Sequence, residues 1–121
     1  MTERMTESFL ADCRARLAFD VLAHTWTPVV LFGLAAGPRR PGELRAAIGG
    51  VSPKVLTQAL RRMERDGLVS RRRYGGAPPR VEYVLTSAGR ALLEAVRPLG
   101  DWAVLHGDAV LDAQEKMADE P

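Results

Sequence analysis

Residues 51–66 decide the fold of this chain, and they read VSPKVLTQALRRMERD. Ser52 is suited to cap a helix through its side-chain oxygen, and Pro53 suits the first helical position, where its missing N–H costs nothing. Gly67 follows as a stop signal. Between these marks, apolar residues recur at helical spacing and predict one buried stripe, formed by Val55, Leu56, Ala59, Leu60 and Met63.

The opposite face of this predicted helix is basic and polar. Cations, amides and hydroxyls suit an electronegative partner that also offers hydrogen-bonding edges, and the major groove of DNA is such a partner. Taken alone, a solvated basic face is the commoner explanation, and the sequence that follows favours DNA. The face consists of Lys54, Thr57, Gln58, Arg61 and Arg65, with Arg62 on its flank.

After Gly67 the apolar period changes from helical to two, which predicts a β-hairpin. Residues 68–74 form one expected strand and residues 81–85 its partner. Residues 75–80, GGAPPR, form a loop with turn residues and a cation at its edge. A basic hairpin directly after a basic helix is a wing. Its candidate DNA contacts are Arg71, Arg73 and Arg80, whereas Arg39, Arg40 and Arg72 are expected to be solvated.

Further helices are predicted on both sides. Residues 12–23, 25–36 and 41–48 have helical patterning, with Thr25 as the cap of the second helix. Residues 41–48 and the basic helix flank a tight glycine-containing turn, which is the helix-turn-helix arrangement. Downstream, a helix is expected to begin at Thr86 or Ser87 and to run to about residue 96, where Pro98 interrupts or kinks it.

Residues 99–113 continue an apolar stripe that is too long for so small a core to cover, so a second subunit is predicted to cover it. The expected fold is mainly α with a small β-hairpin wing: a winged helix-turn-helix with N- and C-terminal dimerisation helices. One domain spans residues 1–121, with its core at 11–98 and its dimerisation helix at 99–114. The ends, 1–10 and 115–121, are expected to be flexible, and the acidic stretch from 108 to fray.

The chain has 121 residues, of which 46% are apolar, enough for one compact domain with a modest core. A single cysteine, Cys13, excludes an internal disulfide framework and fits a reducing, cytoplasmic setting. No apolar run approaches the roughly 20 residues of a membrane span, and no signal-peptide pattern is present. We therefore expect a cytoplasmic protein with no membrane contact.

The formal net charge of +2 is unevenly distributed. Residues 38–90 contain twelve Arg or Lys and four acids, so this segment carries +8 and the two flanks together carry −6. A basic middle between acidic ends indicates a localised contact with a polyanion.

Several ungapped motifs occur in order along the chain: GPRR at 37–40, GELR at 42–45, SPKVLTQ at 52–58, DGLV at 66–69 and PPRVEY at 78–83, then LT at 85–86 and GR at 89–90. With these, and with Cys13, Ala18, Asp20, Leu22 and Trp26 upstream, the chain resembles the HxlR-type branch of the winged-helix transcriptional regulators, close to the MarR-like proteins. The resemblance covers about residues 13–102. It implies a homodimer that binds operator DNA, with the helix before the wing in the major groove and the terminal helices at the dimer interface.

The sequence departs from the family pattern at four places. Ala23-His24-Thr25 stands where the family has Gly-Gly-Lys, and Arg14 stands where it has proline. Pro41 replaces a common aromatic residue, and Ala59 replaces a common arginine of the recognition helix. The first two changes bear on sensing, and the last bears on the DNA contacts.

Within the recognition helix, we expect some side chains at base edges and others at phosphates. Glutamine can bridge an adenine and arginine a guanine, whereas phosphate contacts fix register without reading sequence. Arg80 is expected in the minor groove. The base-edge candidates are Lys54, Thr57, Gln58 and Arg61, and the phosphate candidates are Ser52, Arg62, Arg65, Arg71 and Arg73.

Five side chains could line an aromatic effector pocket between the core and the terminal helices, although ordinary packing is the favoured alternative. They are Phe19, Trp26, Phe32, Trp102 and His106. His24 and His106 are far apart in sequence and lack a nearby cysteine pair, so no metal site or cofactor is expected. No nucleophile elbow or phosphate loop appears, so no enzymatic activity is expected.

Cys13 is a candidate redox residue. If Asp12 caps the first helix, Cys13 lies in the first turn, where unpaired N–H groups favour a thiolate, with Arg14 and Arg16 nearby. The resemblance points the same way, because some relatives sense oxidants or electrophiles through a cysteine at this position. A structural cysteine, a non-covalent effector or no effector are the alternatives.

The sequence therefore predicts a sequence-specific DNA-binding transcriptional regulator. We expect a homodimeric repressor that binds an inverted-repeat operator and is released by an unknown effector or by thiol modification. The alternative is a winged-helix protein–protein interaction module without sequence-specific DNA binding.

Overall fold

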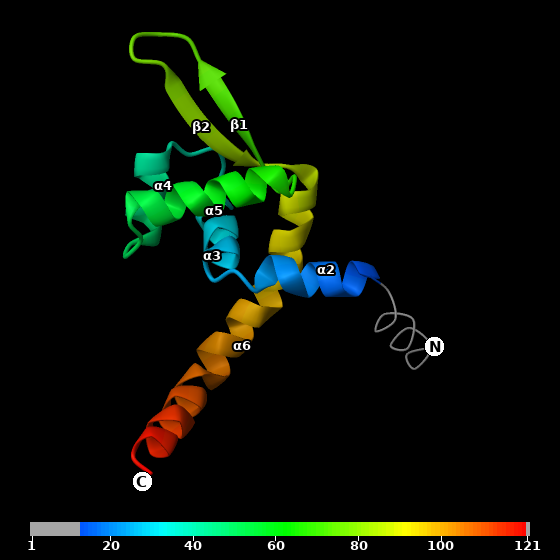
Figure 1. The fold of residues 1–121 in the computed structure, drawn as a ribbon, viewed down its shortest axis with the longest axis vertical. Helices are drawn as coiled ribbons and strands as arrows, with labels where there is room; N and C mark the ends of the chain where they lie inside the picture. The colour runs from blue at the N-terminus through cyan, green and yellow to red at the C-terminus, as the bar shows by residue number, and fades with distance from the viewer. Residues whose placement is uncertain (1–12, 121) are drawn as a thin grey trace.

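The computed structural model describes residues 13–120 and shows a mainly helical fold with one β-hairpin (Figure 1). The hairpin projects from one end of the molecule, and the second half of the last helix projects from the other. The mainly α winged-helix prediction is therefore confirmed. Along the chain the elements are α2 (Cys13–Leu22), α3 (Trp26–Gly33), α4 (Pro41–Ile48), α5 (Pro53–Arg65), β1 (Val69–Tyr74), β2 (Arg80–Leu85) and α6 (Ser87–Ala118).

The core lies where α3, α4, α5, the base of the hairpin and the start of α6 meet. Close packing is visible at Gly33, where an added Cβ would lie 2.6 Å from Cδ1 of Leu44. A larger residue there would separate α3 from α4. The buried core residues are Val30, Leu31, Leu34, Leu44, Val51, Leu56, Ala59, Leu60, Met63, Leu68, Val69, Tyr83, Leu85, Leu93 and Val96.

The basic helix α5 begins and ends as its sequence predicts. Ser52 is the N-cap residue, and its Oγ accepts a hydrogen bond from the backbone N–H of Val55 at 3.1 Å. Pro53 occupies the first helical position, and Gly67 has φ of 74°, a backbone conformation that favours glycine. The predicted apolar stripe is confirmed, since Leu56, Leu60 and the rest of it are buried or half-buried.

The two strands pair antiparallel, with Val69 opposite Leu85 and Tyr74 opposite Arg80. Strand β2 has a further backbone partner that the sequence did not predict. Arg39 exchanges two backbone hydrogen bonds with Tyr83, at 3.0 and 2.8 Å, so the segment before α4 lies along the open edge of β2. This bridge ties α4 to the wing.

The corner between β2 and α6 is built around Thr86. Its Oγ1 donates to the carbonyl oxygen of Gly67 at 2.6 Å and accepts from the N–H of Gly89 at 3.1 Å. Its backbone N–H donates to the carbonyl oxygen of Leu68 at 3.0 Å. The end of α5, the start of the hairpin and the start of α6 are therefore joined through one residue.

The last helix corrects two expectations. Of the two outcomes expected at Pro98, an interruption is wrong and a kink is found, because α6 is helical from Ser87 to Ala118. Proline removes one intrahelical hydrogen bond, and an exposed helix can bend at that point and continue; Figure 1 shows such a change of direction between the yellow and orange parts of α6. Residues 108–118, for which fraying was expected, are also helical.

The start and end of α3 also differ from expectation. Thr25 precedes the helix, but its backbone is helical (φ −50°, ψ −43°) and its side chain makes no capping hydrogen bond. The helix ends at Gly33 rather than near residue 36, and residues 35–37 form a turn closed by hydrogen bonds back to Phe32 and Leu34. The predicted arm at residues 1–10 and the predicted cap Asp12 lie outside the described residues.

Candidate nucleic-acid interface

The exposed face of α5 carries the predicted polar set. Lys54, Thr57, Gln58, Arg61 and Arg65 are exposed, and the buried stripe fixes the opposite face against the core. The helix thus presents cations and amides outward on a rigid support. This is the arrangement needed to insert a helix into the major groove of DNA.

Arg62 differs from its neighbours on α5. It is half-buried, and its Nε is buried with no hydrogen-bond partner within residues 13–120. The Nε end of its guanidinium group is therefore covered by the protein. Only part of its guanidinium group is available to a partner such as a phosphate.

The register of the hairpin sorts the wing cations onto two faces. Successive side chains of a strand point to opposite faces, so Arg71 and Arg73 share the face of the buried Val69. Arg71 also forms an ion pair with Glu64 of α5, so this face is turned toward α5. Arg72 lies on the other face, which agrees with the expectation that it is solvated.

Arg80 does not share the face of Arg71. It is paired with Tyr74, and alternation places both on the face of Arg72. The sequence analysis listed Arg80 with Arg71 and Arg73 as candidate DNA contacts of the wing, because residue types alone do not show how the two strands pair. Arg80 is nevertheless exposed at the end of the hairpin nearest the loop.

A cavity of about 520 Å³ lies between the hairpin loop and the start of α4. Arg80 and Arg40 both line it, together with Pro41 and residues 77–79 and 81. Arg40 was expected to be solvated. The sequence therefore did not predict that Arg40 and Arg80 lie beside the same cavity. The edge bridge at Arg39, which brings the neighbouring residue to the hairpin, is what places Arg40 there.

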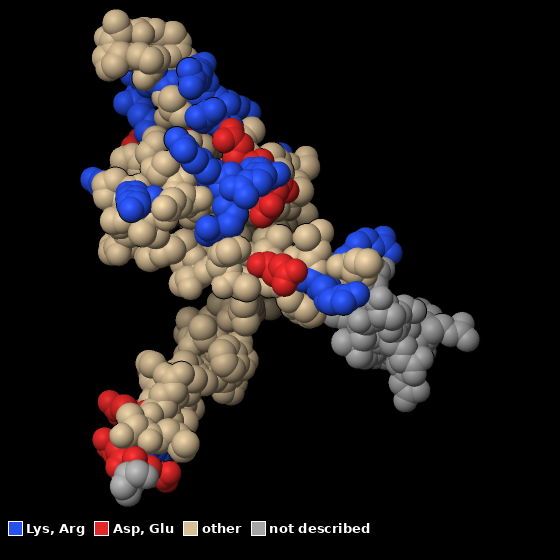
Figure 2. Space-filling view, viewed as in Figure 1, with Lys and Arg blue, Asp and Glu red and all other residues tan. Residues whose placement is uncertain are grey.

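Figure 2 shows the resulting charge distribution on one face of the molecule. Lys and Arg gather over the wing and the adjoining helices, the middle of α6 is free of charge in this view, and acids gather at its C-terminal end. Two acids within the basic region are paired with arginine: Glu43 with Arg40 at 3.9 Å and Glu64 with Arg71 at 3.6 Å. Within residues 13–120, no carboxylate lies within ion-pair distance of Lys54, Arg61, Arg65 or Arg73.

The second half of α6 exposes apolar side chains on more than one side. Trp102 is 50% exposed and Leu105 77%, on or beside the predicted stripe, and Val104 is 86% exposed on a different side of the helix. Leu99, Leu111 and Met117 are exposed as well. Apolar side chains exposed to this extent on one helix indicate that a partner covers them.

The five aromatic-pocket candidates are dispersed in the chain. Trp102 and His106 are neighbours, with ring centroids 5.9 Å apart. Phe32 faces Gly100 of α6, whereas Phe19 is exposed on α2 and Trp26 packs against the core. Phe32 also lines a cavity of about 420 Å³ with Val29, Gly33, Arg39, Ala47 and Ile48, none of which was a candidate.

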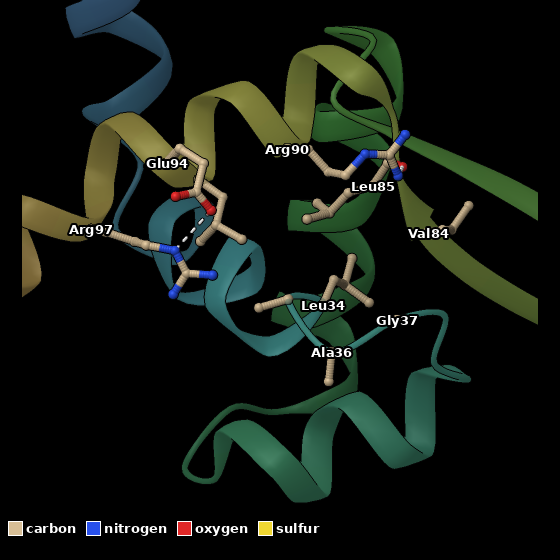
Figure 3. A pocket seen from close by; sticks show the side chains of 10 residues that line it. Leu34, Ala36, Gly37, Val84, Leu85, Arg90, Glu94 and Arg97 are labelled. Carbon is tan, nitrogen blue, oxygen red and sulfur yellow. Dashed lines mark hydrogen bonds and ion pairs between the residues drawn. The ribbon is translucent and has the colours of Figure 1, made fainter.

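Another cavity, of about 300 Å³, lies between the end of α3, strand β2 and the start of α6 (Figure 3). Its arginines are engaged within the chain: Arg90 donates to the carbonyl oxygen of Leu85 at 3.0 Å, and Arg97 pairs with Glu94 at 2.9 Å. None of the five aromatic candidates lines this cavity.

Cys13 is the first residue of α2, and it is exposed. The predicted cap, Asp12, lies outside the described residues, so the placement of Cys13 in a capped first turn stays a prediction. Within residues 13–120, no group of three or more His, Cys, Asp or Glu is placed to hold a metal ion, and no helix is long and apolar enough to cross a membrane.

The family model for the HxlR-like helix-turn-helix matches residues 21–110, which is 90 of the 121 residues. The chain belongs to the HxlR-like helix-turn-helix family of transcriptional regulators. The HTH-type transcriptional regulator YtfH of Escherichia coli is 37% identical over 110 residues, which cover 91% of this chain and 87% of YtfH.

Two solved structures of regulators in their reduced forms are also similar. The redox regulator HypR in its reduced form matches with a TM-score of 0.74 and 30% identity, covering 82% of this chain and 98% of HypR. The reduced form of the transcriptional regulator YodB from Bacillus subtilis matches with a TM-score of 0.67 and 30% identity, covering 74% of this chain and 88% of YodB. The family's regulators are generally not enzymes.

Proposed function

We propose that this regulator binds a specific operator sequence as a homodimer and represses transcription there. One observation carries the proposal: the exposed polar face of α5 adjoins the hairpin face that bears Arg71 and Arg73, so one surface offers both base-reading and phosphate-binding groups. The basic charge of residues 38–90 supports it.

Within this proposal, α5 occupies the major groove. Lys54, Thr57, Gln58 and Arg61 read base edges, because they are exposed on the face opposite the core. The phosphate contacts come from Ser52, Arg62, Arg65, Arg71 and Arg73. Arg80 enters the minor groove from the end of the wing, and Arg40 joins it as an additional backbone contact because both line one cavity.

A second copy of the chain covers α6. The second half of this helix has more exposed apolar surface than one protomer buries, and Trp102 is its largest side chain. A two-fold dimer presents two copies of α5 to one side of a duplex, with centres about 34 Å apart. The operator is therefore an inverted repeat. We keep the predicted domain arrangement as part of this proposal, with the boundary at residue 98 now inside one continuous helix.

We also propose release from DNA by an effector. The aromatic candidates are not gathered in one protomer, so such a site requires the second copy to complete it around Trp102 and His106. Thiol modification of Cys13 is the second candidate signal. It is supported by the exposure of this residue and by the likeness to HypR and to YodB, whose structure is also known after diamide treatment.

The thiol proposal is tested by treating wild type and Cys13→Ser with diamide and measuring operator affinity by fluorescence anisotropy. A loss of affinity in wild type alone supports sensing by Cys13. An equal response of both proteins, or of neither, assigns Cys13 a structural role.

The test of the DNA proposal is selection from a random pool of duplexes by the full chain. We expect the recovered sequences to share an inverted repeat with half-sites one helical turn apart. Recovery of unrelated sequences would favour the rival function, a winged-helix protein–protein interaction module without specific DNA binding. Cytoplasmic location and the absence of any membrane partner belong to the same proposal.

A further inference from the structure

The recognition helix and the wing are joined by one ion pair that neither the fold nor the proposed DNA contacts require. Nε of Arg71 on β1 lies 3.6 Å from Oε2 of Glu64 on α5. The two side chains are 39% and 35% exposed, so both face solvent at the edge of the DNA-binding surface. The other two ion pairs among residues 13–120 each join residues three apart, Arg40–Glu43 and Arg97–Glu94.

Arg71 is thereby distinguished from the other cations of the same surface. Arg61, Arg65 and Arg73 have no carboxylate within ion-pair distance in the described chain, so their guanidinium groups are free for phosphate. Arg71 is already partly neutralised before DNA arrives. A phosphate that binds Arg71 must compete with the carboxylate of Glu64 for the same guanidinium group.

We propose that Glu64 is an internal competitor of DNA phosphate for Arg71 and thereby lowers the affinity of this regulator for any duplex. The inference rests on the proposed DNA-binding function. Phosphate contacts supply affinity without sequence information, so an acid that occupies one phosphate-binding cation weakens non-specific binding while leaving the base-reading side chains of α5 untouched.

The pair can be isolated by a double-mutant cycle on the full chain. Fluorescence anisotropy measures binding of one random-sequence duplex at several salt concentrations by wild type, Glu64→Gln, Arg71→Gln and the double variant. Glu64→Gln should raise affinity about two- to fivefold, the range of an exposed ion pair. It should also steepen the plot of log affinity against log salt by about 0.9, the value for one additional phosphate neutralised.

The decisive comparison is Glu64→Gln in a protein that lacks the guanidinium group of Arg71. In the Arg71→Gln background, Glu64→Gln should change affinity much less, because no guanidinium group is left to release. Asp66→Asn is the matched control, since Asp66 is an exposed acid at the end of α5 with no ion pair to the wing in the described chain. Its effect should be the same with and without Arg71.

Several results would overturn the inference. Unchanged or weaker binding by Glu64→Gln would show that the carboxylate does not compete with DNA. An equal effect of Glu64→Gln in both backgrounds would show that Glu64 acts only by repelling DNA phosphate at a distance, which is the effect that Asp66→Asn measures. If wild type and all variants fail to bind any duplex, the proposed function fails as well; binding by wild type without coupling between residues 64 and 71 removes this inference alone.

Discussion

Replacing Gly89 with alanine tests whether α6 is seated on the hairpin as the structure shows. A Cβ at this position would overlap the carbonyl oxygen of Leu68, lie 3.1 Å from its carbonyl carbon and lie 3.3 Å from Cδ2 of Leu85. The obstacle is backbone, which cannot rotate away as a side chain does. The start of α6 must therefore move away from the hairpin.

The cost follows from what that movement disturbs. Overpacking of a close contact costs about 1–3 kcal/mol. The displaced helix also strains the Thr86 N–H bond to Leu68 at 3.0 Å and the Gly89 N–H bond to Thr86 at 3.1 Å, each contributing about 1 kcal/mol. Alanine recovers up to about 1 kcal/mol through its higher helix propensity. We expect the free energy of unfolding to fall by about 2–4 kcal/mol.

Guanidinium chloride denaturation followed by circular dichroism, at one fixed protein concentration, measures this change. Gly42→Ala is the control, because Gly42 lies in α4 and an added Cβ there would meet nothing within 4 Å beyond its chain neighbours and its own helix backbone. That variant should be as stable as wild type or up to about 1 kcal/mol more stable. If Gly89→Ala unfolds within 0.5 kcal/mol of the control, roughly the error of such a comparison, the seating of α6 is wrong.

Three further predictions concern α5 and the dimer. Ser52→Ala should lower the free energy of unfolding by about 1 kcal/mol, because its Oγ caps α5 at the Val55 N–H; a thermal melt that matches wild type would contradict this. Arg61→Ala should cost about 1–3 kcal/mol in operator binding and relax sequence preference, whereas Arg62→Ala should weaken all duplexes alike; anisotropy on operator and scrambled duplexes separates the two outcomes, and identical losses would refute the assignment. Trp102→Asp should convert a dimer to a monomer in sedimentation velocity and abolish operator binding; a stable, folded wild-type monomer at micromolar concentration would refute the dimer.

The sequence was sufficient for the elements whose signals are local. Ser52, Pro53 and Gly67 mark α5 because capping, proline placement and positive φ are properties of single residues and their immediate neighbours. The hairpin was predicted for the same reason, since its strands alternate and its loop is rich in glycine and proline. The exposed cations of α5 followed directly from its helical period.

Features that depend on distant contacts were missed. The edge bridge of Arg39 to Tyr83 leaves no local pattern, and it brings Arg40 to the cavity shared with Arg80. The face of Arg80 required the strand register, which residue types alone do not fix. The expected interruption at Pro98 is wrong and the expected kink is found, because an exposed helix can bend at a proline and continue.

The most direct test of the central claim is the ratio of two affinities measured for the wild-type protein at physiological salt. The first is the affinity for a duplex from the promoter of its own gene, and the second is the affinity for a scrambled duplex of the same length and composition. Reading of base edges by α5 predicts a ratio of about a thousand or more. A ratio near one, with strong salt dependence for both duplexes, would show that the basic surface binds phosphate alone and would contradict the specific-regulator account.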